Sequence, residues 1–187
     1  VGSEMCIRDR LGIILGLMMC FDLGGPVNKA AYLFATAGLS TGDESSMQIM
    51  AAVMASGMVA PIALSLATFI RKSLFTPAEQ ENGKSAWLLG LSFVSEGAIP
   101  FAAADPFRVI PSMMAGGAVT GAISMALSVG SRAPHGGVFV FFAIDPFWGY
   151  LVAIAAGVVV STAAVLAMKQ FWPCLLYTSD AADDLLC

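Results

Sequence analysis

Two polar segments that break helices interrupt sequence that is otherwise apolar over membrane-spanning lengths. Residues 95–100 read Ser-Glu-Gly-Ala-Ile-Pro, and residues 133–137 read Ala-Pro-His-Gly-Gly and hold the only histidine. Ionisable side chains at membrane depth are costly and are kept where they face protein or a water-filled cavity. Irregular backbone is tolerated there only in the same surroundings. The two segments together predict a polar substrate site inside a membrane protein.

The composition also indicates a membrane protein. Hydrophobic residues make up 58% of the chain and charged residues only 12%, against about 25% charged residues in soluble domains. A chain of 187 residues cannot bury this much apolar surface in its own core, so lipid must solvate part of it. We therefore expect an all-α membrane protein, a polytopic helical bundle in contact with membrane lipid.

Several other classes of site have no support in the sequence. There is no basic cluster of the kind that binds nucleic acid. The cysteines and the histidine show no metal-ligand spacing, and no glycine-rich loop of the nucleotide-binding type occurs. We expect neither a metal nor a cofactor.

The two ends of the chain differ sharply from the rest. Residues 1–10 join an apolar run abruptly, and residues 174–187 follow Trp172 and Pro173 with an equally abrupt change. Both resemble translated adapter sequence at the ends of gene fragments, so we expect 1–10 and 174–187 to be non-native read-through. Genuine short tails are the alternative. Residues 11–173 then form a partial membrane domain.

Three apolar segments are long enough to cross a bilayer, which takes about 20 residues. They are Met47–Ile70, in which Pro61 is expected to kink the helix, Val109–Gly130 and Leu151–Met168. Two shorter apolar segments precede them, Leu11–Phe21 and Ala30–Leu39.

The basic residues orient these segments. Loop 71–84 is the most basic in the chain and is expected in the cytoplasm, as is Lys169 at the far end of the last span. Segment 86–104 is long enough to cross but contains Glu96 and Pro100. If it crosses, Lys169 falls outside; if it dips in and returns, Lys169 stays inside. Because Lys169 is expected in the cytoplasm, a re-entrant hairpin at 86–104 is favoured over a full crossing.

Four polar side chains are candidates for the site. Glu96, at the tip of the hairpin, could bond a polyhydroxylated ligand and act as a general base toward a hydroxyl; the alternative is a cap on a broken helix. His135 could donate to a sugar hydroxyl or relay a proton, or simply bond loop carbonyls. Asn28 could bond hydroxyls and Lys29 neutralise a phosphate, or the two could form an ordinary helix start with a snorkelling lysine.

Two Asp-Pro pairs suggest helix starts. In both Asp105-Pro106 and Asp145-Pro146, the carboxylate can cap free amide groups and proline fits the first helical turn. We expect these two pairs to have a structural role.

Five motifs in order resemble one family. They are residues 22–31, 95–101, 104–106, 108–111 and 133–137, which read DLGGPVNKAA, SEGAIPF, ADP, RVIP and APHGG. Together they resemble the fructose-type enzyme IIC membrane component of the bacterial phosphoenolpyruvate:sugar phosphotransferase system. The resemblance runs over 11–173 and covers the C-terminal part of the IIC domain, without its first helices and without the IIA and IIB domains.

The resemblance implies a function. It implies a homodimeric, multi-pass permease of the bacterial inner (plasma) membrane, with re-entrant hairpins around a sugar, most simply fructose. A phosphocysteine on a IIB partner, supplied through IIA and the phosphocarrier HPr, phosphorylates the sugar. Glu96 would contact the hydroxyl that is phosphorylated, with Ser95 and Gly97 binding substrate beside it and His135 as a further sugar ligand. This chain alone would be inactive.

Two other functions remain open. An ion-coupled secondary transporter of a small polar solute would use Glu96 as a protonation site and deliver unmodified substrate. An intramembrane enzyme without transport would need a catalytic dyad, and the sequence offers neither paired membrane aspartates nor a Ser-His signature. The product, phosphorylated or free sugar, separates the permease from the transporter.

Overall fold

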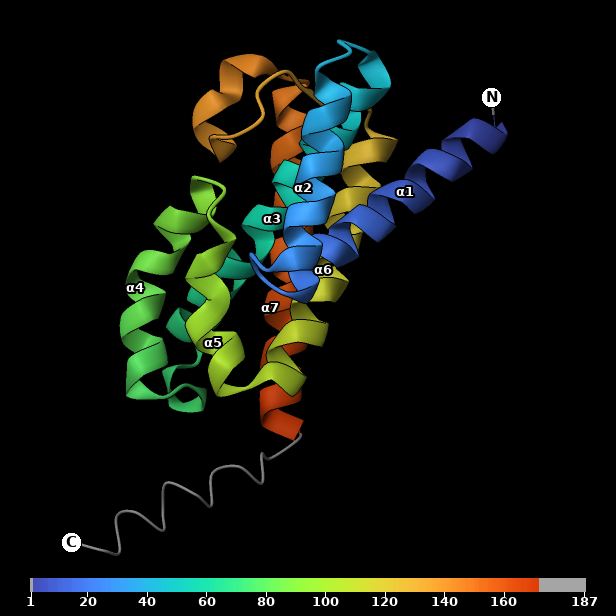
Figure 1. The fold of residues 1–187 in the computed structure, drawn as a ribbon. Helices are drawn as coiled ribbons and strands as arrows, with labels where there is room; N and C mark the ends of the chain where they lie inside the picture. The colour runs from blue at the N-terminus through green and yellow to red at the C-terminus, as the bar shows by residue number, and fades with distance from the viewer. Residues whose placement is uncertain (1, 172–187) are drawn as a thin grey trace, which may run out of the picture.

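A computed structural model describes residues 2–171, with side chains from residue 6 onward, as a mostly helical bundle (Figure 1). Within those residues the α-helices are α1 Gly2–Phe21, α2 Pro26–Leu39, α3 Glu44–Ile70, α4 Pro77–Leu91, α5 Ile99–Ala104, α6 Pro106–Ala126 and α7 Phe147–Phe171. Also present are 3₁₀ helices η1 Lys72–Leu74, η2 Ser95–Ala98 and η3 Gly137–Ala143, and an antiparallel ribbon of β1 Gly130–Ser131 and β2 Ile144–Asp145. The expected helical fold is confirmed, whereas the expectation for residues 174–187 lies outside the described residues.

Three of the described helices, α3, α6 and α7, are long and apolar enough to cross a membrane. They overlap the three expected spans, and α3 continues through Pro61. The expected end of the second span at Gly130 was wrong, because α6 ends at Ala126. Ser128 then takes a left-handed backbone conformation, with φ 51°, and Gly130 begins the β1–β2 ribbon.

Helix α3 is the centre of the bundle. It contacts α1, α2, α4, α6 and α7, and its side chains are buried along most of its length. Because it is apolar on all sides and rich in alanine and serine, neighbouring helices can approach it closely from every direction. Figure 1 shows the other long helices arranged around it.

Helix α1 packs along α6 through glycines. A side chain on Gly16 would collide with the backbone carbonyl of Gly117, so the two helices approach at backbone distance. Helix α1 includes residues 2–10, for which we expected a non-native origin. A helical conformation does not bear on that origin.

The expected loop 71–84 was wrong in extent, because α4 begins inside it at Pro77. Thr76 and Glu79 form a capping box: the backbone N–H of Thr76 donates to Glu79 at 2.7 Å, and the N–H of Glu79 donates to the Thr76 hydroxyl at 3.3 Å. Together with proline in the first turn, these residues are a sequence signature of a helix N-terminus. The Thr-Pro-Ala-Glu signal was present in the sequence.

After α4 the chain turns back along the bundle (Figure 1). At the tip of this turn, the Ser95 hydroxyl donates to the carbonyl of Gly57 at 3.3 Å, and Gly57 lies half-way along α3. On the return path, the ring of Phe101 in α5 meets that of Phe75, just before α4, at 6.1 Å between centroids. Segment 86–104 is therefore three elements, α4, η2 and α5, which reach the middle of α3 and return.

A buried ion pair joins the start of α4 to the end of α7. The ammonium of Lys169 lies 3.0 Å from a carboxylate oxygen of Glu79, and the two side chains are only 5% and 3% exposed. The same ammonium lies 4.1 Å from the centroid of the Phe75 ring. The basic loop after α3 and Lys169 thus lie at the same end of the bundle, as the charge argument required.

Candidate functional site

A cavity of about 700 Å³, here called the central cavity, opens beside the tip of the α4–α5 turn. Small-molecule sites commonly have volumes of about 300–1,000 Å³. The cavity is lined by Gly24, Asn28, Lys29, Tyr32, Phe93, Val94, Ser95, Glu96 and His135. Five of the six candidate site residues meet there, although they come from three separate stretches of the chain.

The α1–α2 turn approaches Glu96 closely. Gly24 has φ +107°, and a Cβ built on it would lie 3.1 Å from the carboxylate carbon and from one carboxylate oxygen of Glu96. The positive φ therefore favours glycine, and an added methyl group would press against the Glu96 side chain. This contact brings the motif of residues 22–31 against that of residues 95–101.

Asp22 fixes the start of α2. Its two carboxylate oxygens accept the backbone N–H groups of Val27 at 2.7 Å and Asn28 at 3.0 Å. These are amides of the first helical turn, which have no partner inside the helix. Asp22 therefore holds the first turn of α2, and with it Asn28 and Lys29, at the edge of the cavity.

Three of the candidate residues are engaged in the fold. The buried Asn28 amide donates to the carbonyl of Met19 at 2.7 Å, which ties α2 to the end of α1. Ser95 is also buried and bonded to α3. Gly97 does not line the cavity: it is buried and its carbonyl accepts from Asn82 of α4 at 2.9 Å.

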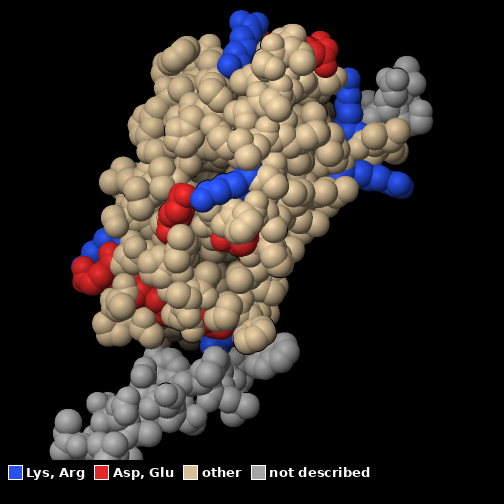
Figure 2. All heavy atoms as spheres, in the orientation of Figure 1, with Lys and Arg blue, Asp and Glu red and all other residues tan. Residues whose placement is uncertain are grey.

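The remaining candidates, Glu96, Lys29 and His135, are exposed side chains. They bring a carboxylate, an ammonium and an imidazole to the lining of one cavity. Figure 2 shows acidic and basic side chains together midway along one face whose middle is otherwise mostly uncharged. Such a set can accept protons from hydroxyl groups and donate to hydroxyl and phosphate oxygens.

Sequence reasoning missed the aromatic part of the lining. The ring of Phe93 lies 6.0 Å from that of Tyr32 and 5.3 Å from that of His135, centroid to centroid. Neither Tyr32 nor Phe93 has a local signal that separates it from the other apolar residues around it. Only the packing of α2 against the α4–α5 turn brings them together.

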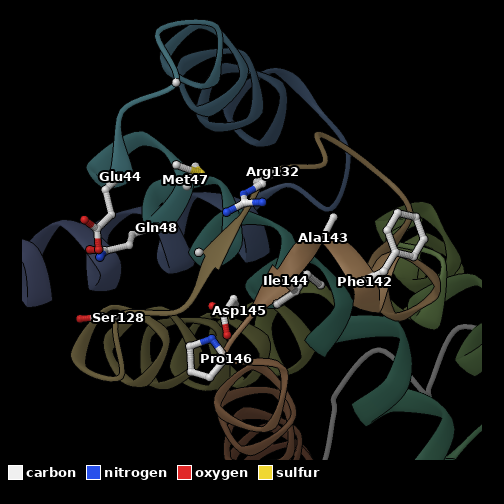
Figure 3. A pocket seen from close by; sticks show the side chains of 12 residues that line it. Glu44, Met47, Gln48, Ser128, Arg132, Phe142, Ala143, Ile144, Asp145 and Pro146 are labelled. Carbon is white, nitrogen blue, oxygen red and sulfur yellow. The ribbon is translucent and has the colours of Figure 1, made fainter.

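A second cavity, also of about 700 Å³, lies at the opposite end of α3 from the Glu79–Lys169 pair (Figure 3). Glu44 and Gln48 from the start of α3 face Arg132, which follows β1, and Asp145 of β2 across it. The expected helix start at Asp145-Pro146 is confirmed: Asp145 ends β2, α7 begins at Phe147 directly after the pair, and the backbone N–H of Tyr150 donates to the carbonyl of Pro146 at 3.3 Å. None of the six candidate site residues lines this cavity.

The Asp105-Pro106 pair marks a helix start, but the Asp105 side chain does not cap the helix. Helix α6 does begin at Pro106, but the Asp105 side chain makes no capping hydrogen bond and pairs instead with Arg108 at 2.5 Å.

Among the described residues, no group of three or more His, Cys, Asp or Glu side chains is placed to hold a metal ion.

Sequence identity to known proteins shows which family the chain is related to. Over 163 residues, 86% of this chain, it is 56% identical to the PTS system fructose-specific EIIB'BC component of Escherichia coli K12. It is 50% identical over 85% of its length to the PTS system fructose-specific EIIC component of Haloferax volcanii, and 48% identical over 86% to the PTS system fructose-specific EIIABC component of Bacillus subtilis. The chain is homologous to fructose-specific enzyme IIC proteins.

The resemblance drawn from the motifs is thereby confirmed. The chain spans 28%, 42% and 25% of the lengths of these three relatives, respectively. One of the three relatives is archaeal, so the bacterial origin of this chain stays a prediction. No family model matches the chain, and no solved structure matches it significantly.

Proposed function

We propose that this chain is the sugar-binding part of a fructose permease, which holds the sugar while a IIB partner phosphorylates it. The observation that carries the proposal is the central cavity, where Glu96, Lys29 and His135 meet beside the middle of α3. The kinship with fructose-specific proteins supports fructose as the sugar. The membrane is the plasma membrane of a bacterium, and the assembly is a homodimer.

Each side chain has a role in this proposal. Phosphoryl transfer depends on positioning the acceptor hydroxyl and on balancing the charge of the phosphoryl group. Glu96 accepts the proton of the attacking hydroxyl as general base. Lys29 lies on the same cavity and offsets the negative charge of the incoming phosphoryl group, while His135 donates to a second hydroxyl. The phosphoryl donor is a phosphocysteine on IIB, recharged through IIA and HPr.

The turn of α4 and α5 is, in this proposal, a re-entrant hairpin that enters from the cytoplasm. Support comes from its reach to Gly57, half-way along α3, and from the return of Phe101 to Phe75. An exposed carboxylate at the hairpin tip would then meet the sugar at half depth. The ends of the hairpin would face the cytoplasmic IIB partner.

Function can be tested in a chimera in which the matched 163 residues of the Escherichia coli relative are replaced by those of this chain. Membranes holding the chimera are given phosphoenolpyruvate, the soluble relay proteins and labelled fructose. We expect sugar phosphate to form. Membranes that bind fructose but form no sugar phosphate would contradict the proposal.

Topology gives a second prediction. We expect a cysteine introduced by Ser73→Cys, in the exposed η1, to resist an impermeant thiol reagent in intact cells and to react in inverted vesicles. The matched variant Ser40→Cys, at the exposed far end of α2, should show the reverse. Both variants are made in a protein from which the other accessible cysteines have been removed. Labelling at position 73 from outside would reject the proposed orientation.

A third prediction concerns Gly24. Gly24→Ala places a methyl group against Glu96 and imposes a left-handed backbone on alanine, so we expect phosphorylation by the chimera to fall about tenfold or more. Gly42→Ala is the matched control. Gly42 also has a positive φ, +69°, but nothing lies within 4 Å of its added Cβ. Equal losses in the two variants would show that backbone strain alone, and not contact with Glu96, is responsible.

A further inference from the structure

Three rings form a continuous part of the lining of the central cavity. Phe93 lies between Tyr32 and His135, with centroid separations of 6.0 Å and 5.3 Å, which are normal for packed aromatic rings. The rings come from α2, from the turn after α4 and from the segment before η3. The same cavity therefore has an aromatic surface as well as its charged groups.

The backbone of Phe93 is unusual. Its φ is +64°, a left-handed conformation that is rare for a bulky residue. Such strain persists where the surrounding structure enforces it, and it is concentrated at ligand sites. Phe93 stands three residues before Glu96, so whatever holds Phe93 also fixes the start of η2.

Two glycines make room for Phe93. A Cβ on Gly57 of α3 would lie 2.5 Å from the Cε2 atom of its ring. A Cβ on Gly137 would lie 2.9 Å from its backbone nitrogen. Two elements remote in sequence thus leave space for this one residue, which is 7% exposed and still reaches the cavity.

A sugar ring suits a cavity with these two kinds of surface. Its hydroxyl groups project from the edge of the ring, while its faces carry C–H groups. The face of an aromatic ring is electrically negative and attracts the positive ends of C–H bonds. The charged groups can hydrogen-bond the sugar hydroxyls while the aromatic rings pack against a C–H face of the sugar ring.

We propose that Phe93, together with Tyr32, binds the C–H face of the sugar ring and so sets which hydroxyl reaches Glu96. This inference rests on the proposed function. It makes Phe93 and Tyr32 specificity-determining residues of the permease. A ring that only filled space between helices would contribute to stability and not to sugar affinity.

The test uses fructose phosphorylation by the chimera. Phe93→Leu and Tyr32→Leu each remove an aromatic face and keep an apolar side chain. We expect each to raise KM for fructose about fivefold to tenfold while kcat stays within about twofold. Phe93→Tyr and Tyr32→Phe keep the face and should raise KM less than the leucine variants do. Phe142→Leu, which alters an exposed ring on the second cavity, is the matched control.

The outcomes separate the two proposals. If the unsubstituted chimera forms no sugar phosphate, the proposed function fails and the aromatic site fails with it. If the chimera is active but both leucine variants keep its KM, the aromatic site alone is wrong. The same holds if the leucine and aromatic variants lose activity equally. Should Phe93→Leu not fold, Tyr32→Leu decides, because Tyr32 is only half-buried.

Discussion

Replacing Glu96 by glutamine is expected to lower the phosphorylation rate of the chimera by about 10²–10⁴-fold, the usual contribution of a general base. Glutamine keeps a hydrogen-bonding side chain of nearly the same shape but cannot accept the proton of the attacking hydroxyl. Fructose binding, measured by equilibrium dialysis on the same membranes, should therefore survive. The combination of retained binding and lost turnover is what identifies a base.

Glu81→Gln is the matched control for this substitution. Glu81 lies on α4, 72% exposed and paired only with Lys84 on the surface, and it does not line the central cavity. We expect its turnover to equal that of the unsubstituted chimera. Normal turnover in the Glu96→Gln variant would remove Glu96 from the chemistry, and an equal loss in both variants would point to a general effect of charge.

Removing the Lys169 ammonium is expected to cause the largest loss of stability. Lys169→Met keeps most of the apolar stem but leaves the Glu79 carboxylate buried without its partner. Breaking a buried pair in this way costs about 3–5 kcal/mol. The double variant Glu79→Gln/Lys169→Met removes both charges and should recover most of that free energy of unfolding.

The surface pair on the same helix provides the control. Lys84 and Glu81 approach to 2.6 Å but are 64% and 72% exposed, so Lys84→Met should cost only about 0–1 kcal/mol. The free energy of unfolding can be measured in detergent from labelling of Cys20, which is fully buried, with the other cysteines replaced. Equal costs for Lys84→Met and Lys169→Met would contradict a stabilising role for the buried pair.

Much of the architecture was predictable because membrane spans are encoded by composition. The three long apolar segments needed no knowledge of tertiary contacts, since helices of that length and hydropathy have few alternatives in lipid. The prediction missed the start of α4, because residues 77–84 are polar and were interpreted as a loop, although Thr76 and Glu79 carry a capping signal. Polar helices are recognised by their caps more readily than by their hydropathy.

The grouping of the candidate site residues was predictable in part for a similar reason. Glu96 and His135 stood out because ionisable groups are rare in apolar sequence, and the structure brings both to one cavity. Phe93 and Tyr32 could not be distinguished in this way, since aromatic residues are common among the apolar ones. Their meeting depends on how α2 packs beside the α4–α5 turn, a long-range contact that no local pattern encodes.

The most direct test of the account is fructose uptake by cells that lack their own fructose permease, carry the chimera and supply the phosphoryl relay. The chemical state of the label inside the cells is the measurement. We predict phosphorylated fructose that disappears when the relay proteins are deleted. Free fructose inside the cells, or uptake that survives loss of the relay and depends on the proton gradient, would contradict the account and favour an ion-coupled transporter.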